Sequence, residues 1–247
     1  MFSRVGGKSK LKKIIIKKIP KHKTYVEPFV GGGHIFFGRE EPSYIEVIND
    51  KDIDIYHFYK DMKKYGSKMI NKNWNNPTRK KFNYFLKNRP TNHIERLYRN
   101  IYLSLMSYSG NRKSYIGEKT ESNYHGVELG KKYKTDKWEK RLKNVKIYNK
   151  DFEYIIKKYD APDTFFYLDP PYEESNVNKS IYYNHSVEPI RIYNALKNIK
   201  GNFLLSYNNS PNIRKLFKEF RIIKVKTSYE LSGTLKSNIT ELLIKNY

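Results

Sequence analysis

Residues 24–33 read TYVEPFVGGG, in which a short strand pattern at residues 24–27 continues through Pro-Phe-Val into three consecutive glycines. Glycine has no Cβ, so such a run lets the backbone adopt conformations and approach ligands in ways that other residues prevent. Residues 44–48 form a second strand pattern that ends at Asp50, and a helix pattern follows from Asp52. Between the two strands we expect a helix that opens near His34. Strand, glycine-rich turn, helix, strand and acidic residue are the order of a nucleotide-binding βαβ half.

The middle of the chain has a different pattern. Pro77 is expected to open a helix that runs to Phe85, because proline suits the first helical turn. Apolar residues recur at helical spacing between Ile94 and Tyr108, and the residues that follow are polar and contain glycines. We therefore predict that residues 60–136 form an inserted, mostly helical subdomain with a hairpin or loop at its end.

Strand and helix patterns alternate again in the last part of the chain. The predicted elements are strand 145–148, helix 152–159, strand 164–168, helix 189–199, strand 202–207, helix 211–220 and strands 221–229 and 241–247. Two consecutive strands at the end are typical of an antiparallel pair that closes a sheet. We thus predict an α/β fold with a mixed sheet, in which residues 1–59 and 137–247 form one domain.

The composition favours a polyanionic partner. The 247 residues include 49 Lys and Arg against 25 Asp and Glu, a formal net charge of +24. A protein with this excess repels itself unless it meets a polyanion, so nucleic acid is the expected partner. An AT-rich genome would also encode an excess of Lys, Asn, Ile and Tyr, so the charge supports this interpretation without deciding it. The absence of cysteine excludes disulfides, thiolate zinc sites and cysteine nucleophiles.

We expect neither a membrane segment nor a metal site. The apolar run Ile14–Ile16 is far shorter than the core of a signal peptide, and no stretch approaches the roughly 18 apolar residues of a membrane helix. The six histidines are scattered and show no metal-ligand spacing. The expected protein is soluble and intracellular, without a membrane partner.

The sharpest motif is Asp169-Pro170-Pro171-Tyr172, which directly follows the apolar strand pattern 165–168. Two prolines fix φ twice and remove two amide donors, so they impose a rigid turn at the carboxyl end of that strand. Ligands bind at this edge of an open α/β sheet. The turn offers a carboxylate, carbonyl groups and an aromatic ring, which match the N–H donors and the flat face of an adenine. An ordinary strand-terminating turn is the structural alternative.

This motif resembles the catalytic motif of the amino-methyltransferases, and the whole chain resembles the Dam-type DNA adenine methyltransferase family. Four further segments resemble motifs of that family, in the family's order: residues 4–11, 25–33, 49–59 and 241–247. The resemblance implies a Rossmann-like methyltransferase fold that uses S-adenosylmethionine, releases S-adenosylhomocysteine and needs no metal. It also implies that residues 1–59 and 137–247 are the catalytic domain, with 60–136 as the target-recognition subdomain.

The resemblance gives the proline motif at residues 169–172 a role in catalysis. The implied catalytic residues are Asp169, Pro170, Pro171 and Tyr172. Tyr172 would stack on an adenine flipped out of the duplex, since DNA methyltransferases cannot reach their target atom within the base stack. The carboxylate of Asp169 and the carbonyl of Pro170 would accept hydrogen bonds from the adenine amine and turn its nitrogen toward the methyl group.

The resemblance also implies a set of cofactor contacts. These residues are Arg4, Lys8, Glu27, Phe29, Gly31, Gly32, Gly33, Asp50, Asp151, Phe152 and Asp169. The glycines would admit the methionine portion, Lys8 would pair with its carboxylate, and Asp50 would accept both ribose hydroxyls. Asp52 is the rival of Asp50, and a helix N-cap is the structural alternative for both Asp50 and Asp151. Arg4 stands where the family has an aromatic or other residue.

Residues 107–115 stand where the family has its recognition hairpin. The expected DNA contacts are Asn111, Arg112, Lys113 and Tyr115. Basic side chains with interleaved tyrosines suit phosphate and base contacts, and Arg112 is the candidate for reading a guanine. A solvated basic loop is the alternative. This chain has Tyr-Ser-Gly at 108–110 where the family commonly has Phe-Asn-Gly, a departure that bears on whether the family's usual target, GATC, applies.

The implied function is a site-specific DNA adenine methyltransferase with duplex DNA as its partner. An RNA adenine methyltransferase, a cytosine-amine methyltransferase and an inactive nucleic-acid-binding module on the same fold remain alternatives. The intact proline and glycine motifs argue against the inactive module, because a pure binding protein has no use for them. A cognate restriction nuclease is a candidate second partner, and both monomer and dimer remain open.

Overall fold

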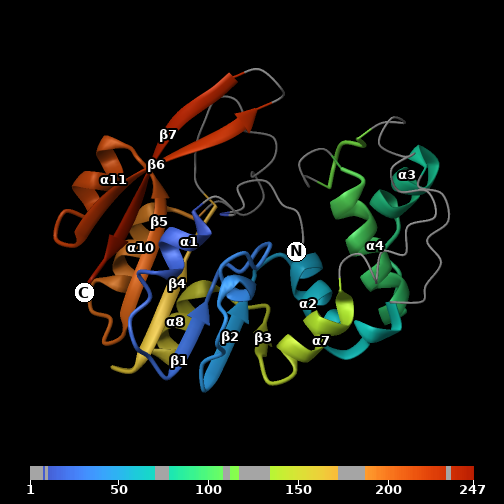
Figure 1. Ribbon diagram of the computed structural model, residues 1–247, viewed down its shortest axis with the longest axis horizontal. Coiled ribbons are helices and arrows are strands. Elements are labelled where there is room, and N and C mark those ends of the chain that lie inside the picture. The colour runs from blue at the N-terminus through green and yellow to red at the C-terminus, as the bar shows by residue number, and fades with distance from the viewer. Residues whose placement is uncertain are drawn as a thin grey trace. The chain divides into compact units, whose positions relative to one another are not determined.

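Figure 1 shows the protein as a computed structural model. The structure describes residues 8, 11–69, 78–107, 112–116, 134–171, 187–231 and 235–247, without the side chains of residues 227–239. Within these residues the fold is mixed α/β, built on a seven-stranded sheet in the order β3-β2-β1-β4-β5-β7-β6.

The centre of the sheet is parallel. β1 (Thr24–Glu27) lies between β2 (Ile45–Asn49) and β4 (Thr164–Leu168), and β5 (Asn202–Asn208) pairs with β4. β3 (Lys146–Tyr148) is the strand beyond β2. The chain proceeds from β1 to one side of the sheet and from β4 to the other. The boundary between β1 and β4 is therefore a topological switch point, where α/β sheets bind ligands at their carboxyl ends.

An antiparallel hairpin closes the other side of the sheet. β6 (Arg221–Leu231) and β7 (Leu235–Lys245) pair along their whole length, and β7 inserts between β5 and β6. β7 runs antiparallel to β5, with Glu241 opposite Asn208. This confirms the predicted Rossmann-like fold with an antiparallel strand at its end, and it places Glu241 beside the carboxyl end of β5.

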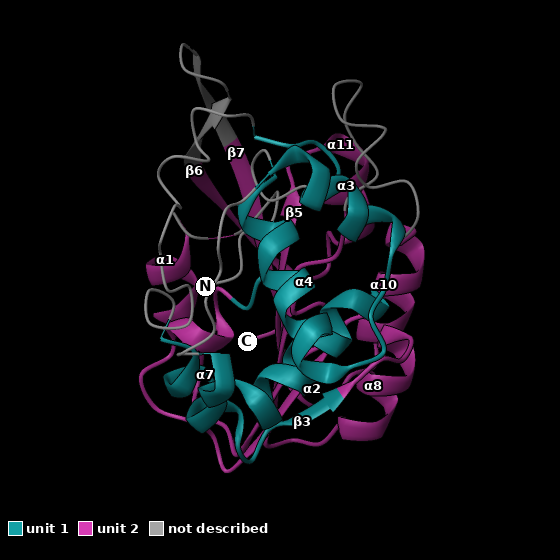
Figure 2. Ribbon diagram, turned by 90° about the vertical axis from the view of Figure 1, so that its right-hand side faces the viewer, with its two compact units in different colours: residues 1–7, 31–33, 52–147 teal, residues 8–30, 34–51, 148–247 magenta. Residues whose placement is uncertain are grey.

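Helices cover both faces of the sheet. Figures 1 and 2 show α8 (Phe152–Tyr159) and α10 (Pro189–Leu196) on one face and α1 (Lys12–Ile16) on the other. The short helix α11 (Pro211–Leu216) packs with the first two into one hydrophobic core. Every side chain of β4 is buried, which explains its uninterrupted apolar sequence, since strands covered on both faces do not alternate.

The turn after β1 differs from the prediction. Gly31 and Gly33 have φ values of 46° and 67°, a left-handed region that residues with a Cβ rarely adopt. The helix expected near His34 is not formed; a single 3-10 turn, η1 (Phe36–Gly38), stands in its place. Arg39 is already extended, so the helical segment after the glycine turn ends at Gly38 and consists of this single turn.

The structure divides into two compact units, coloured separately in Figure 2. One contains Gly31–Gly33 and residues 52–147, and the other contains residues 8–30, 34–51 and 148–247. The first unit thus extends beyond the expected subdomain 60–136 in both directions. It includes α2 (Ile53–Tyr65) and α7 (Thr135–Leu142). These helices pack together through Phe58 and Trp138, with ring centroids 6.0 Å apart.

The first unit is mostly helical. Its described elements are α2 (Ile53–Tyr65), η2 (Ser67–Met69), α3 (Arg79–Lys87), α4 (His93–Leu105) and α7 (Thr135–Leu142). Side-chain caps fix the starts of three helices, because Asp52, Thr78 and Asn92 accept hydrogen bonds from amides of the first turn. Pro77, expected to open α3, lies outside the described residues. None of the helices in the described ranges has the length and apolar character needed to cross a membrane.

Candidate active site

The carboxyl end of β4 leads directly into the proline motif. Asp169 follows the last residue of β4, and its side chain is 21% exposed. Pro170 is buried and Pro171 half-buried, whereas Tyr172 lies outside the described residues. The carboxylate therefore stands at the switch point between β1 and β4, at the edge where the sequence pattern predicted it.

One oxygen of the Asp169 carboxylate is held from two sides. Ser206 on β5 donates a hydrogen bond from Oγ to Asp169 Oδ1 over 2.9 Å, and Lys8 Nζ lies 2.9 Å from the same oxygen. The hydroxyl of Tyr167 is 3.2 Å from Ser206 Oγ and donates to it, because the serine proton is directed at Asp169. Both contacts fall on Oδ1, so neither engages Oδ2.

Lys8 lies between two carboxylates. Its ammonium nitrogen is 2.9 Å from Asp169 Oδ1 and 2.7 Å from Glu241 Oε1, and the side chains of Lys8 and Glu241 are each 4% exposed. The sequence led us to expect Lys8 at the carboxylate of a cofactor, yet the structure places it on carboxylates of the protein. A buried ammonium needs nearby anions to offset the loss of water, and these two meet that need.

A second carboxyl group is buried at the end of β1. Tyr25 donates a hydrogen bond from its hydroxyl to Glu27 Oε2 over 2.8 Å. Burial raises the pKa of Glu27 to about 8, and the negative charge of Asp169 adds to this effect. Burial, followed by the charge of Asp169, also raises the pKa of Tyr167 well above its usual value, which keeps that hydroxyl a donor. Glu27, expected to contact a cofactor, thus points into the protein interior.

The residues at the start of α8 have structural partners of their own. Asp151 caps the helix by accepting a hydrogen bond from the Glu153 amide over 3.0 Å, and Arg191 Nη2 lies 3.2 Å from Asp151 Oδ1. The N-cap alternative therefore describes Asp151 in this structure. Phe152 is buried in the core with its ring centroid 5.2 Å from that of Phe29. Phe29 is half-buried and so is the more accessible ring of the two.

The structure separates the two acidic residues after β2. Asp52 caps α2 by accepting a hydrogen bond from the Asp54 amide over 2.9 Å, which leaves the Asp50 carboxylate outside that cap. Asn149 Nδ2 donates to the Asp50 carbonyl over 2.8 Å, and Asn49 Nδ2 donates to the Pro28 carbonyl over 2.9 Å. Neither asparagine was assigned a role from the sequence. Asn49 at least could have been noticed, because it directly precedes the acidic residue.

His34 is a further residue that the sequence did not single out. Its Nδ1 atom is buried without a hydrogen-bond partner. Burial is the main reason that its pKa lies below the ordinary value, and Lys8 and Asp169 exert smaller, opposite effects. A neutral imidazole with an unpaired ring nitrogen can exchange a hydrogen bond with a polar ligand. Its place directly after the three glycines was the available signal.

The expected recognition segment closes on itself. Ser107 and Tyr115 form an antiparallel bridge, and the ring of Tyr115 packs against Phe82 with centroids 5.2 Å apart. Lys113 is exposed between them. Asn111, the other expected DNA contact in this segment, and Arg4, an expected cofactor contact, lie outside the described residues.

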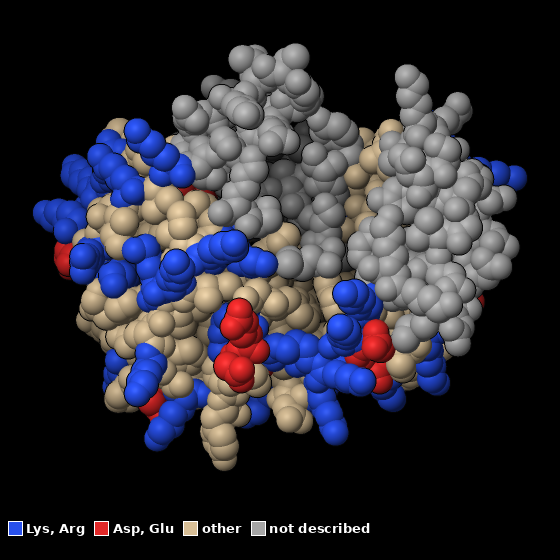
Figure 3. All heavy atoms as spheres, viewed as in Figure 1, with Lys and Arg blue, Asp and Glu red and all other residues tan. Residues whose placement is uncertain are grey.

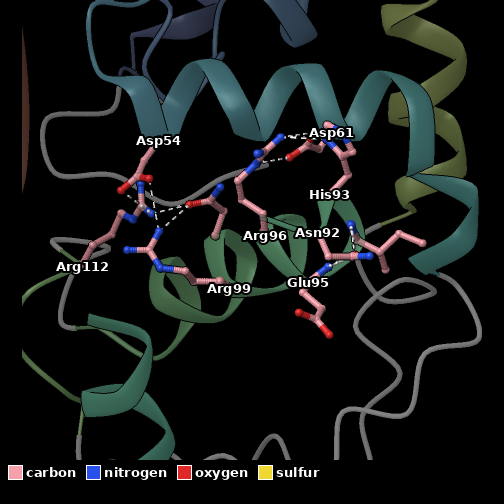
Figure 4. Close-up of polar contacts among 10 residues, drawn as sticks. Asp54, Asp61, Asn92, His93, Glu95, Arg96, Arg99 and Arg112 are labelled. Carbon is pink, nitrogen blue, oxygen red and sulfur yellow. Dashed lines mark hydrogen bonds and ion pairs between the residues drawn. The ribbon is translucent and has the colours of Figure 1, made fainter. Parts of the chain in front are cut away.

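Arg112 is held inside its own unit. Its amide donates to Ser107 Oγ over 2.8 Å at a φ of 58°. Figure 4 shows its guanidinium directed at Asp54, 3.5 Å away, and at Asn100, and only 12% of the side chain is exposed. The predicted contact of Arg112 with a guanine would require these interactions to break.

Arg112 belongs to a larger polar network between α2 and α4. Arg99 Nη1 lies 3.2 Å from Asp54, and Arg96 binds the buried Asp61 through two bonds of 2.8 Å. Figure 4 shows both acids pointing from one side of α2 toward α4. From the sequence, the α4 region indicated only an apolar stripe. The seven-residue spacing of the acids and the three-residue spacing of the arginines would have indicated these facing helices.

In the part of the chain that the structure describes, no group of three or more His, Asp or Glu side chains is placed to hold a metal ion.

Comparison with known proteins identifies the family. Residues 5–231 match the D12 class N6 adenine-specific DNA methyltransferases. The chain is 28% identical to the Type II methyltransferase M1.LlaDCHI of Lactococcus lactis subsp. cremoris, covering 98% of this chain and 93% of that protein. It is 29% identical to the Type II methyltransferase M.MjaIII of Methanocaldococcus jannaschii, covering 98% and 96%. A third relative is M.CviBI of Paramecium bursaria Chlorella virus NC1A, at 25% identity over 98% and 97%.

The match extends over almost the whole chain, and it agrees with the resemblance inferred from the ordered motifs. It assigns the enzyme class as adenine-specific DNA methyltransferase. The chain belongs to the D12 class N6 adenine-specific DNA methyltransferase family.

Proposed function

We propose that the protein transfers a methyl group from S-adenosylmethionine to the exocyclic amine of an adenine that is flipped out of duplex DNA. The observation that carries the proposal is the Asp169 carboxylate, which stands at the switch point and is bound through Oδ1 by Lys8 and Ser206. Family membership supplies the reaction class, and the site supplies an oriented acceptor for an amine.

The Asp169 carboxylate is assigned to the amine of the target base. Lys8 and Ser206 hold the carboxylate in place through Oδ1, and we assign this carboxylate to accept a hydrogen bond from the adenine. The carbonyl of Pro170 is the second acceptor, and Pro171 keeps that turn rigid. In the transfer, the nitrogen would take the methyl group from the sulfonium, the neutral thioether of S-adenosylhomocysteine would be the leaving group, and the surplus proton on the nitrogen would pass to solvent. Preorganised acceptors stabilise the positive charge that grows on the nitrogen. Tyr172 is assigned to stacking on the base.

The residues near the glycine turn fit a cofactor of this kind. S-adenosylmethionine, when bound, supplies a methyl group activated by a sulfonium. Gly31 and Gly33 adopt positive φ values, which glycine allows, and without a Cβ they let a ligand approach the turn closely. Gly32 between them is part of the same assignment. His34 adds a buried ring nitrogen that can bond a polar group of a ligand.

Acidic and aromatic side chains complete the cofactor assignment. Asp50 is assigned to the ribose hydroxyls, because Asp52 is already committed to the cap of α2. Phe29 and the start of α8, at Asp151 and Phe152, are assigned to the adenine ring of the cofactor. Lys8 is assigned to support of Asp169 rather than to direct cofactor contact, since it is buried against two carboxylates of the protein. Glu27 is buried against Tyr25 and is not assigned to direct cofactor contact either.

Duplex DNA is the proposed substrate. The net charge is +24, and Figure 3 shows Lys and Arg side chains outnumbering Asp and Glu over the described part of one face. We assign Lys113 and Tyr115, with Asn111, to the DNA, and Arg112 if it leaves its contacts in the helical unit. GATC is the first target to test. A cognate nuclease is proposed as a partner, because the relatives are named Type II methyltransferases.

The proposal is tested by transfer of a labelled methyl group to unmethylated duplex DNA that contains GATC. We expect the wild-type protein to label adenine, and Asp169→Asn to lower the rate by roughly 100-fold or more, because it removes a preorganised charge at the reacting nitrogen. Asp160→Asn is the matched control. Asp160 receives amide hydrogen bonds from Lys200 and Gly201, before the amino end of β5, and its change should leave the rate unaltered.

The modified nucleoside decides between the remaining alternatives. Digestion of the labelled DNA should give N6-methyladenosine as its deoxynucleoside. Label on the cytosine amine, or label on RNA while duplex DNA stays unlabelled, would contradict the proposal. Failure to bind S-adenosylmethionine would favour an inactive nucleic-acid-binding protein.

A further inference from the structure

Glu241, on the strand that closes the sheet, touches the same lysine as Asp169. Lys8 Nζ is 2.7 Å from Glu241 Oε1 and 2.9 Å from Asp169 Oδ1. The contact to Glu241 is thus the shorter of the two. The side chains of Lys8 and Glu241 are both 4% exposed, whereas that of Asp169 is 21% exposed. The lysine and the glutamate therefore lie beneath a carboxylate that solvent and ligands can still reach.

The topology explains how Glu241 arrives there. β7 runs antiparallel to β5 and pairs Glu241 with Asn208, the last residue of β5. The segment of β7 that pairs with β5 therefore begins beside the carboxyl ends of the parallel strands. In an all-parallel sheet, this position would be occupied by the end of another strand and its following loop, so the reversed strand is what places a glutamate next to the site.

Charge balance gives this arrangement a consequence for Asp169. A buried ammonium with one carboxylate partner would direct its whole charge at that partner and weaken it as a hydrogen-bond acceptor. A second carboxylate on the same ammonium divides that charge. Lys8, Asp169 and Glu241 together carry one net negative charge, so Asp169 can be fixed by a cation and still act as an anion toward an amine.

We propose that Glu241 is a positioning residue of the methyl-transfer site, which acts through Lys8 to fix the Asp169 carboxylate and to preserve its strength as an acceptor. Glu241 need touch neither the adenine nor the cofactor. The inference rests on the proposed function, because it assigns Glu241 a part in the same reaction.

A purely structural ion pair is the competing explanation. Buried ion pairs often add little stability compared with apolar residues of the same volume, but the removal of one partner alone is costly. A loss of activity in a Glu241 variant would therefore not separate the two roles. The pH dependence of the rate per folded molecule does separate them. Once the folded fraction at each pH has been measured by circular dichroism, a loss of folded protein alone leaves that rate and its pH profile unchanged.

The test is the single-turnover rate of methyl transfer by Glu241→Gln, which keeps the shape of the side chain and removes its charge. We expect the rate to fall roughly 10-fold to 100-fold, as for other partners that orient a reacting ligand. The acid limb of the rate–pH profile should move to lower pH, because Glu241 no longer offsets the positive charge of Lys8 beside Asp169. The affinity for S-adenosylhomocysteine, measured by calorimetry, should stay unchanged.

Glu46→Gln is the matched control. Glu46 is equally buried and is paired with Arg39 Nη1 at 2.9 Å, but it lies near the amino end of β2, away from the carboxyl edge. Its rate and pH profile should be those of the wild-type protein. An unchanged rate in folded Glu241→Gln, or a lower rate with the acid limb in its original place, would overturn the proposal.

The double variant Lys8→Met/Glu241→Gln keeps the proposal testable if Glu241→Gln does not fold, because it leaves no lone buried charge. If Glu241 acts only through Lys8, the double variant should react as fast as Lys8→Met. A further loss of rate would contradict the inference. Absence of adenine methylation by the wild-type protein would instead contradict the proposed function, so the two failures are distinguishable.

Discussion

Folding changes the protonation of the Glu27 carboxyl group. It is 2% exposed and accepts a hydrogen bond from Tyr25. Burial raises its pKa from 4.5 to about 8. At a pH between these two pKa values, Glu27 keeps its proton in the folded protein but has released it in the unfolded chain. The folded state is therefore stabilised at low pH, and this contribution is lost as the pH rises toward 8.

This linkage predicts a specific pH dependence of stability. The free energy of unfolding should fall by at most about 1.4 kcal/mol per pH unit from Glu27 alone, between roughly pH 5 and pH 8. Glu27→Gln, which is uncharged at every pH, should remove that slope. Urea unfolding followed by circular dichroism at several pH values measures it. Equal slopes in the variant and the wild-type protein would show that Glu27 is ionised in the folded state.

At the scale of secondary structure, the contact between α2 and α4 depends on buried charges as well as on apolar packing. Asp61 is 2% exposed and is bound by Arg96, and Asp54 is bound by Arg99. The later acid of α2 pairs with the earlier arginine of α4, so the two helices run antiparallel. Arg112 joins this network from the 107–115 segment. The segment expected to meet DNA is therefore attached to the helices by the residue expected to read a base.

Substitution of Arg112 tests this attachment. Arg112→Ala should lower the free energy of unfolding by roughly 1–3 kcal/mol, because it removes one buried partner each from Asp54 and Asn100. Lys113→Ala is the matched control: Lys113 is exposed, so its effect should stay within about 0.5 kcal/mol. Urea unfolding measures both. Equal stability of the two variants would show that the network contributes nothing. The guanine-reading role would then gain support if Arg112→Ala also relaxed target specificity.

For the molecule as a whole, the net charge of +24 predicts DNA binding that weakens steeply with salt. The logarithm of the binding constant should fall linearly with the logarithm of salt concentration. Lys113→Ala should reduce that slope by roughly one, the change expected when one phosphate contact is lost. Lys157→Ala is the control, since Lys157 is exposed on α8 in the other unit. Fluorescence anisotropy at several salt concentrations measures the slope. A binding constant that does not change with salt would contradict the prediction.

Much of this architecture could be predicted from the sequence. β1, β4 and α8 have the predicted bounds, because buried apolar runs and the Asp151 cap mark their ends. α1 was missed, since Ile14–Ile16 is a β-branched run that does not favour a helix. The helix expected near His34 was wrong, because the left-handed glycines and the extended Arg39 leave room for a single turn.

The side-chain pairings of the site were much harder to predict. The turn with Asp169 was placed correctly at the carboxyl end of its strand, because two prolines have strong local effects. The contact of Lys8 with Glu241 joins residues near the two ends of the sequence. No local pattern specifies such a pair; it follows from the insertion of β7 beside β5. The same limit applies to Arg112 and Asp54, whose contact depends on how α2 and the 107–115 segment fold together.

The neighbours of β1 come from very different places in the chain. β2 follows it after a short connection, whereas β4, on its other side, begins only at Thr164, beyond the whole 52–147 unit. On the ribosome, one edge of β1 therefore stays open until the nascent chain has reached Leu168, while the helical unit can already fold. Lys8, which precedes β1 in the chain, receives Glu241 only when β7 has emerged. A chain cut short before that strand would have its proline turn but would lack the completed charge cluster.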